Sequence, residues 1–134
     1  MGDSDSGFRE DTPGDVTVLV VEDHDHFRST LCDLVTFTEG FVLAGEAATG
    51  EAALRATDEL SPRLVLMDKR MPGIGGIETC RMLKDRHPET VVVLISVEDA
   101  VNPQVLRSCG AAEFVSKTGL SPAVLQEVWQ RHGS

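Results

Sequence analysis

Three acidic residues that could do chemistry stand where short apolar runs end. Glu22 and Asp23 follow Val16–Val21, and Asp68 follows Leu64–Met67. Carboxylates that meet in one place repel one another, and raised pKa values or a bound divalent cation relieve that repulsion. A site built only from hard oxygen ligands suits Mg²⁺, which in turn favours a phosphoryl ligand. These acids therefore indicate a candidate Mg²⁺ and phosphoryl site.

A hydroxyl, an ammonium and a glycine-rich loop extend this candidate site. Ser96 follows the apolar run Val91–Ile95, and Lys117 ends another short run. A phosphoryl group carries negative charge that an ammonium neutralises and a hydroxyl can hydrogen-bond. The stretch Met71–Gly76 can bring its backbone close to such a group. Taken singly, each acid could cap a helix and each of the others could be an ordinary surface group, so the interpretation depends on the fold.

The elements that must position these residues follow from the hydrophobic pattern. Five β-branched runs alternate with segments of helical period, which is typical of a parallel sheet covered by helices. The predicted strands are Val16–Val21, Val42–Ala47, Leu64–Met67, Val91–Ile95 and Glu113–Ser116. The predicted helices are 25–38, Gly50–Glu59, Gly76–Arg86, Pro103–Cys109 and one that opens with Ser121 as N-cap and Pro122.

The first and fourth predicted strands are almost wholly apolar, which indicates a sheet that is buried on both faces. We therefore expect an α/β fold, a doubly wound five-stranded parallel sheet of order 2-1-3-4-5, flavodoxin-like (βα)5. In such sheets ligands bind beyond the carboxyl ends of the strands, where the strand order reverses. This point lies between strands one and three, so Glu22, Asp23 and Asp68 should meet there.

Length and composition exclude several classes of function. The 134 residues, 41% of them hydrophobic, fill one core, and the net charge of −10 disfavours direct binding to nucleic acid or anionic lipid. The longest apolar runs are too short to span a membrane, and the N-terminus lacks a secretion signal. The three cysteines, Cys32, Cys80 and Cys109, lack metal-type spacing and predict buried reduced thiols, so we expect a cytoplasmic location. The expected organisation is a flexible acidic tail (1–15), one folded domain (16–131), and a C-terminal end or start of a linker (132–134).

Four separated motifs occur in order along the chain. They are Glu22-Asp23 after the first strand, Asp68 with Arg70-Met-Pro-Gly-x-x-Gly76, Ser96 after an apolar strand, and Lys117 after Gly110-Ala-Ala-Glu-Phe-Val-Ser. This set resembles the receiver domain of bacterial two-component response regulators over about residues 16–131. Val21-Glu-Asp-His and the segment that ends at Lys117 are most similar to receivers of the NarL/FixJ subfamily.

The resemblance implies the roles of five site residues. Asp68 would accept a phosphoryl group from the phosphohistidine of a histidine kinase. Glu22, Asp23, the Asp68 carboxylate and the Arg70 backbone carbonyl would bind Mg²⁺. Lys117 would neutralise charge on the phosphoryl oxygens, because the loose transition state of phosphoryl transfer spreads charge over them. Apart from self-catalysed phosphotransfer and autodephosphorylation, we expect no enzyme activity.

The resemblance also implies a conformational switch. Ser96 would hydrogen-bond the phosphoryl group and move inward, and Phe114 would rotate into the vacated space, which changes a face that a partner reads. The expected partners are a sensor histidine kinase and an effector domain or downstream protein, and a homodimer is also compatible. The chain ends just after the last predicted helix, so we expect either a stand-alone receiver or the receiver of a longer transcription regulator with a DNA-binding helix-turn-helix.

Three positions depart from the common receiver pattern. Lys69 directly follows the phosphoacceptor and puts a second ammonium near the site. Thr118 stands where many receivers have proline, so a cis bond before it is not assumed. Val97 is bulkier than the frequent alanine and would narrow access to Asp68. Lys69 is also compatible with a second interpretation, in which the chain is a receiver-like protein-binding module that works without phosphorylation.

Alternatives remain for several other residues. A phosphoaspartate hydrolase of the haloacid dehalogenase type needs a second aspartate where Arg70 stands. His24 and His26 are either solvated or capping residues, or ligands of a transition metal. Phe114 is either a simple core residue or the switch. Trp129 either anchors the last helix on the sheet or belongs to an interface.

Overall fold

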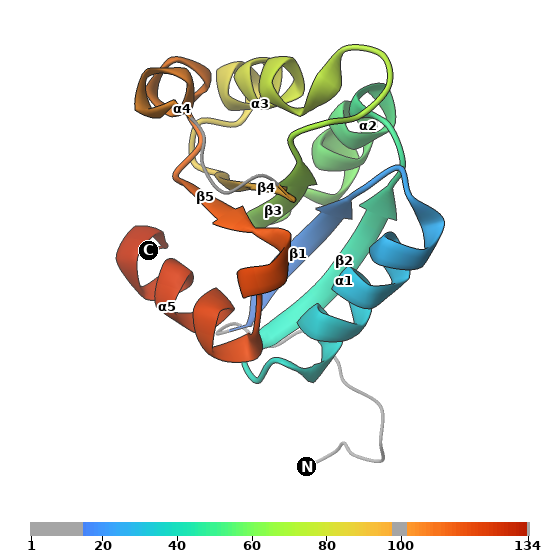
Figure 1. Cartoon of the computed structure of the whole chain (residues 1–134), viewed down its shortest axis with the longest axis vertical. Coiled ribbons are helices and arrows are strands. Elements are labelled where there is room, and N and C mark those ends of the chain that lie inside the picture. Colours follow the sequence, from blue (N-terminus) through green and yellow to red (C-terminus); the bar gives the residue numbers. More distant parts are fainter. Residues whose placement is uncertain (1–14, 98–101, 134) are drawn as a thin grey trace.

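The computed structural model describes residues 15–97 and 102–133, which form a parallel sheet flanked by helices (Figure 1). The strand order is β2-β1-β3-β4-β5, which confirms the predicted doubly wound, flavodoxin-like fold. The strands are β1 (Val16–Val21), β2 (Phe41–Ala47), β3 (Leu64–Asp68), β4 (Val91–Ser96) and β5 (Glu113–Ser116). The helices are α1 (Asp25–Phe37), α2 (Gly50–Leu60), α3 (Gly75–Arg86), α4 (Pro103–Cys109) and α5 (Pro122–His132), with a 3-10 helix η1 (Lys117–Gly119).

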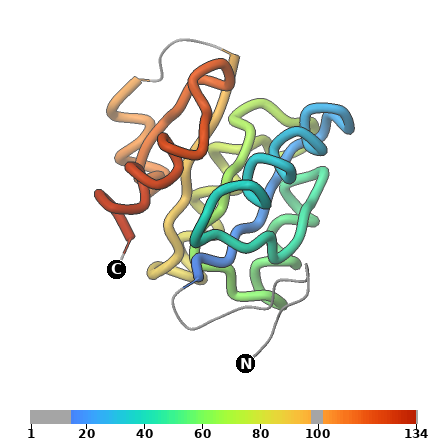
Figure 2. Tube along the Cα trace, turned by 90° about the horizontal axis from the view of Figure 1, so that it is seen from below, coloured from blue at the N-terminus to red at the C-terminus, as the bar shows by residue number. Residues whose placement is uncertain are grey.

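Apolar cores cover both faces of the sheet, as the runs of β-branched residues predict. On one face, Val65, Met67 and Leu94 pack with residues of α2, α3 and α4. On the other face, strand residues such as Leu66 and Ile95 pack with residues of α1 and α5. Figure 1 shows the two helix layers above and below the strands, and Figure 2 looks onto the α1 and α5 layer from below. Burial on both faces fixes the strands and thereby the residues at their ends.

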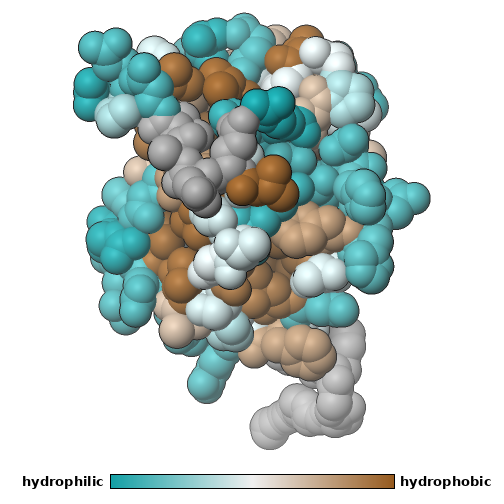
Figure 3. Space-filling model, viewed as in Figure 1, coloured by the Kyte–Doolittle hydropathy of each residue, from teal (hydrophilic) through white to brown (hydrophobic). Residues whose placement is uncertain are grey.

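The core under α1 and α5 reaches the surface of the molecule. Figure 3 shows hydrophobic residues at the surface between these two helices. Phe27, Leu120 and Val124 are partly buried and pack against this core. Trp129 packs against the same core, which confirms its role as an anchor of α5, and the Arg63 guanidinium lies 5.1 Å from its ring centre.

The observed element boundaries agree with the predicted ones to within one residue. Asp68 and Ser96 are the last residues of β3 and β4 rather than the first residues beyond them. Ser121 caps α5, since its side chain accepts a hydrogen bond from Val124 N at 3.2 Å, as predicted. Helix η1 was not predicted. It forms because the Ser116 hydroxyl accepts a hydrogen bond from the backbone N–H of Thr118 and caps this single turn.

Cys80 and Cys109 are buried and free, as predicted, whereas Cys32 is only partly buried because it lies at the margin of its core. The predicted tail 1–15 lies outside the described residues except for Asp15, and so does Ser134. Within the described part of the chain, none of the helices has the length and apolar character of a membrane span.

Candidate phosphoacceptor and metal site

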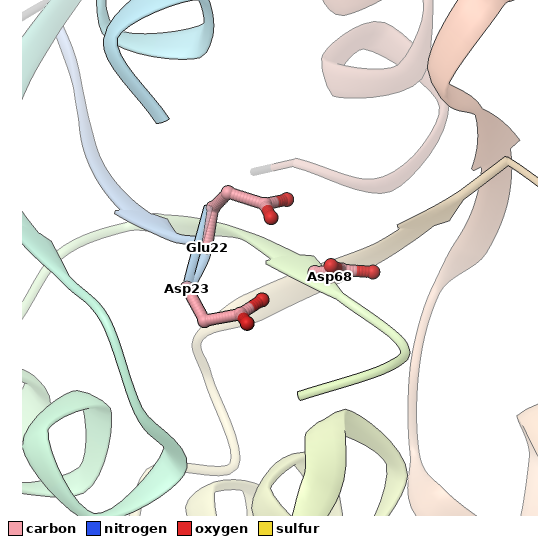
Figure 4. A group of neighbouring side chains, drawn as sticks. All are labelled: Glu22, Asp23 and Asp68. Carbon is pink, nitrogen blue, oxygen red and sulfur yellow. The ribbon is translucent and has the colours of Figure 1, made fainter. Parts of the chain in front are cut away.

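The three predicted acids meet at the carboxyl ends of β1 and β3. Glu22 and Asp68 are buried, with 1% and 5% of their surface exposed, whereas Asp23 is exposed. One carboxylate oxygen from each lies within 4.8 Å of the other two. Figure 4 shows the carboxylates converging from the two strand ends. The meeting point lies between β1 and β3, because the strand order reverses there.

Lys117 joins the acids from the end of β5. Its ammonium Nζ lies 3.0 Å from Glu22 Oε1 and 3.3 Å from Asp68 Oδ2. The Lys117 side chain is 15% exposed, so its charge is largely removed from water and is balanced by these two carboxylates. The structure therefore brings together four of the residues that the sequence singled out.

Burial changes the electrostatics of Glu22. Desolvation raises the pKa of this carboxyl above its ordinary value, and the negative charge of Asp68 raises it further. The Lys117 ammonium and the backbone N–H of His24, which donates to Glu22 Oε2 at 3.1 Å, lower the pKa and offset part of this effect. A cation held among the acids would favour the charged form of Glu22.

The donor set fits a divalent cation with hard oxygen preference. Glu22 Oε1 is buried and, within the described residues, makes an ion pair with Lys117 but no directed hydrogen bond. The acids supply only oxygen ligands, and Asp23 opens the cluster to water, which suits Mg²⁺ because this ion keeps several of its waters. His24 and His26 are exposed and do not belong to this group, the one such group found in residues 15–97 and 102–133.

The loop after Asp68 packs tightly against the end of β3. The backbone N–H of Arg70 donates to Asp68 Oδ1 at 3.1 Å, which orients the carboxylate. Gly76, at the start of α3, donates its N–H to Lys69 O at 3.0 Å. A Cβ on Gly76 would collide with the backbone carbonyl oxygen of Asp68, so only glycine allows this close approach. Gly73, with φ +82°, provides a turn of the loop.

The remaining predicted site residues lie near the same edge of the sheet. Ser96 is 1% exposed at the end of β4, the strand between β3 and β5. Phe114 lies on β5 and packs, partly buried, against the core on the α2, α3 and α4 side. Val97 is 70% exposed. The Lys117–Thr118 bond is trans.

Two residues near the start of α1 make contacts that sequence reasoning missed. Arg28 donates from Nη1 to the Glu22 backbone carbonyl at 2.9 Å and from Nε to Glu46 Oε1 at 2.9 Å, so it ties the end of β1 to β2. The ring of Phe27 has its centre 4.3 Å from Lys117 Nζ. Helical periodicity indicated that Phe27 faces the core, but periodicity cannot indicate which cation meets its ring.

Comparison with known proteins agrees with this geometry. The family model of the response regulator receiver domain matches residues 18–129. Response regulator GacA from Pseudomonas viridiflava is 40% identical over 111 residues, which cover 81% of this chain and 52% of GacA. This chain thus spans about half the length of GacA.

Two solved structures show the same fold. The signal receiver domain of the putative response regulator NarL from Mycobacterium tuberculosis is 31% identical, with a TM-score of 0.72 over 87% of this chain and 98% of that one. A two-component response regulator of the LuxR family from Aurantimonas sp. SI85-9A1 is 25% identical, with a TM-score of 0.79 over 87% and 84%. With the acids, the lysine and the strand order in place, this chain belongs to the response regulator receiver domain family, among its NarL/FixJ-like members.

Proposed function

We propose that this domain is a phosphorylation-controlled switch of a two-component system, in which Asp68 accepts a phosphoryl group from a histidine kinase. The observation that carries the proposal is the convergence of Asp68, two further acids and Lys117 at the strand ends, with Lys117 Nζ 3.3 Å from Asp68 Oδ2. A nucleophile, a cation site and a fixed ammonium are the parts that phosphoryl transfer needs.

In the proposed transfer, a carboxylate oxygen of Asp68 forms the new P–O bond. The P–N bond of the phosphohistidine breaks, and the imidazole nitrogen keeps its electron pair. The Lys117 ammonium neutralises charge on the phosphoryl oxygens, while the Arg70 N–H orients the Asp68 carboxylate. Glu22, Asp23, Asp68 and the Arg70 backbone carbonyl would hold Mg²⁺, which when bound supplies further neutralisation of the phosphoryl charge.

The same arrangement supports a switch at β4 and β5. Ser96, at the end of β4, would hydrogen-bond a phosphoryl oxygen, and Phe114 would change its rotamer. Phe114 is only partly buried, so its ring can move at lower cost than a fully enclosed one. We expect a sensor histidine kinase as the source of the phosphoryl group and a cytoplasmic location for this domain. An effector domain or downstream protein, or a second copy of the chain, would read the change.

The test is incubation with acetyl phosphate and Mg²⁺, followed by intact-mass measurement. Wild type should gain one phosphoryl group, and Asp68→Asn should gain none. Asp85→Asn is a matched control, since Asp85 is exposed on α3 and should leave the adduct unchanged. If wild type stays unmodified even with a kinase that phosphorylates a control receiver, the proposal is wrong and a phosphorylation-independent binding module is favoured.

A further inference from the structure

We propose that Phe27 is a positioning residue of this site, whose ring holds the Lys117 ammonium beside Asp68 through a cation–π contact; this role rests on the proposed function. Phe27 lies in the first turn of α1, and Lys117 follows β5. The two residues are far apart in the sequence, and the fold brings the ammonium to 4.3 Å from the ring centre. This distance is within the range over which a cation is attracted to the face of a ring.

The Lys117 ammonium is held from two sides. The carboxylates of Glu22 and Asp68 lie 3.0 Å and 3.3 Å from Nζ, and the Phe27 ring provides the further contact. The ring is itself fixed, because Phe27 packs against the core that contains Leu31 of the same helix. A fixed ring restricts the positions that the flexible lysine side chain can adopt.

The chemistry of the site explains why an aromatic ring suits this position. A fourth acid would add negative charge to a cluster in which three carboxylates already repel one another. An aliphatic side chain would exclude water but would not attract the ammonium. The Phe27 ring attracts the cation without adding net charge, so Mg²⁺ at the acids would compete with Lys117 for Glu22 and Asp68 but not for the ring.

This difference matters most during transfer. A phosphoryl group on Asp68 would weaken the ion pairs that Lys117 makes with Glu22 and Asp68, and the ammonium would face the phosphoryl oxygens instead. The contact with Phe27 remains available throughout. It keeps the ammonium at the place where negative charge develops, which is where a fixed cation lowers the barrier.

A graded series of rings tests the contact without changing its shape. Replacing Phe27 by mono-, di- and trifluorinated phenylalanine withdraws negative charge from the ring face and keeps the apolar packing. The maximal rate of phosphorylation by acetyl phosphate should fall stepwise along this series, to about one third or less of the wild-type rate, as it should for Phe27→Leu. The same fluorination at Phe41, which is buried in β2 at the opposite end of the sheet, is the control and should leave the rate unchanged.

A thermodynamic cycle separates this role from the proposed function. Urea unfolding of wild type, Phe27→Leu, Lys117→Met and the double variant should give a coupling of about three- to thirty-fold in the unfolding constant. If the cycle shows no coupling, the contact between Phe27 and Lys117 is overturned. If it shows coupling but the phosphorylation rate does not fall stepwise, the role of the contact in transfer is overturned. If Lys117→Met does not fold, stability along the fluorinated series decides: a stepwise loss supports the contact, and none overturns it. If wild type takes no phosphoryl group, the proposed function and the positioning role both fail, while the coupling still reports whether the contact exists.

Discussion

Asp23→Asn should stabilise the protein in the absence of divalent cations and weaken its stabilisation by Mg²⁺. The Asp23 carboxylate lies within 4.8 Å of ligand atoms of both Glu22 and Asp68, and ion pairs join Lys117 to those two acids. At this distance and the dielectric constant of water, each repulsion costs about 1 kcal/mol. Removing the Asp23 charge relieves two of them, so the free energy of unfolding should rise by about 1 to 2 kcal/mol at low salt and by less at high salt.

The measurement is urea unfolding with a chelator and then with increasing Mg²⁺. Wild type should gain stability with the logarithm of the Mg²⁺ concentration once the site begins to fill, and Asp23→Asn should gain less at each concentration. Asp33→Asn is a control, since Asp33 is exposed on α1 and is not part of the acid cluster. Equal stability of Asp23→Asn and wild type in chelator, together with an equal response to Mg²⁺, would refute the idea that these acids form a cation site.

Three further predictions concern other parts of the molecule. Arg131 holds the pKa of Glu113 below its usual value, so this ion pair stabilises the fold above the ordinary pKa of a glutamate and loses that contribution as pH falls. Glu113→Gln should therefore flatten the acid side of a plot of stability against pH. An unchanged slope would show that the ion pair does not stabilise the fold. Gly76→Ala should lower the free energy of unfolding by about 1 to 3 kcal/mol, because the added Cβ would collide with the last carbonyl of β3. A Cβ at Gly119 would have no neighbour within 4 Å, so Gly119→Ala should cost less than Gly76→Ala in the same urea titration. Burial raises the pKa of the Cys32 thiol to about 11, so a thiol reagent near pH 8 should label Cys32 slowly in the native protein and quickly in the urea-unfolded protein. Fast labelling of Cys32 in the native protein would show that this thiol is not protected.

Much of the fold could be predicted because the relevant signals are local. Buried strands such as β1 have continuous β-branched runs, and the cap at Ser121 depends on residues within one turn. The approach of Asp68 and Lys117 was also predictable, since a parallel sheet puts all carboxyl strand ends at one edge. The strand order was the one additional assumption.

The contacts that were missed depend on side-chain reach, which a pattern does not encode. Arg28 crosses from α1 to Glu46 on β2, and these residues are 18 positions apart. The same arginine could instead have faced water, since partly exposed helix positions tolerate either arrangement.

The strand order also explains why a small residue stands at position 96. Lys117 follows β5, yet its ammonium contacts Asp68 at the end of β3 and Glu22 beyond β1. Neighbouring strands lie about 4.8 Å apart, so the lysine has to cross the end of β4, where Ser96 is buried. A long side chain at 96 would compete with Lys117 for this space. Serine is short enough to leave room for the Lys117 side chain, and it carries the hydroxyl that the proposed switch uses. Both demands therefore favour serine at this position.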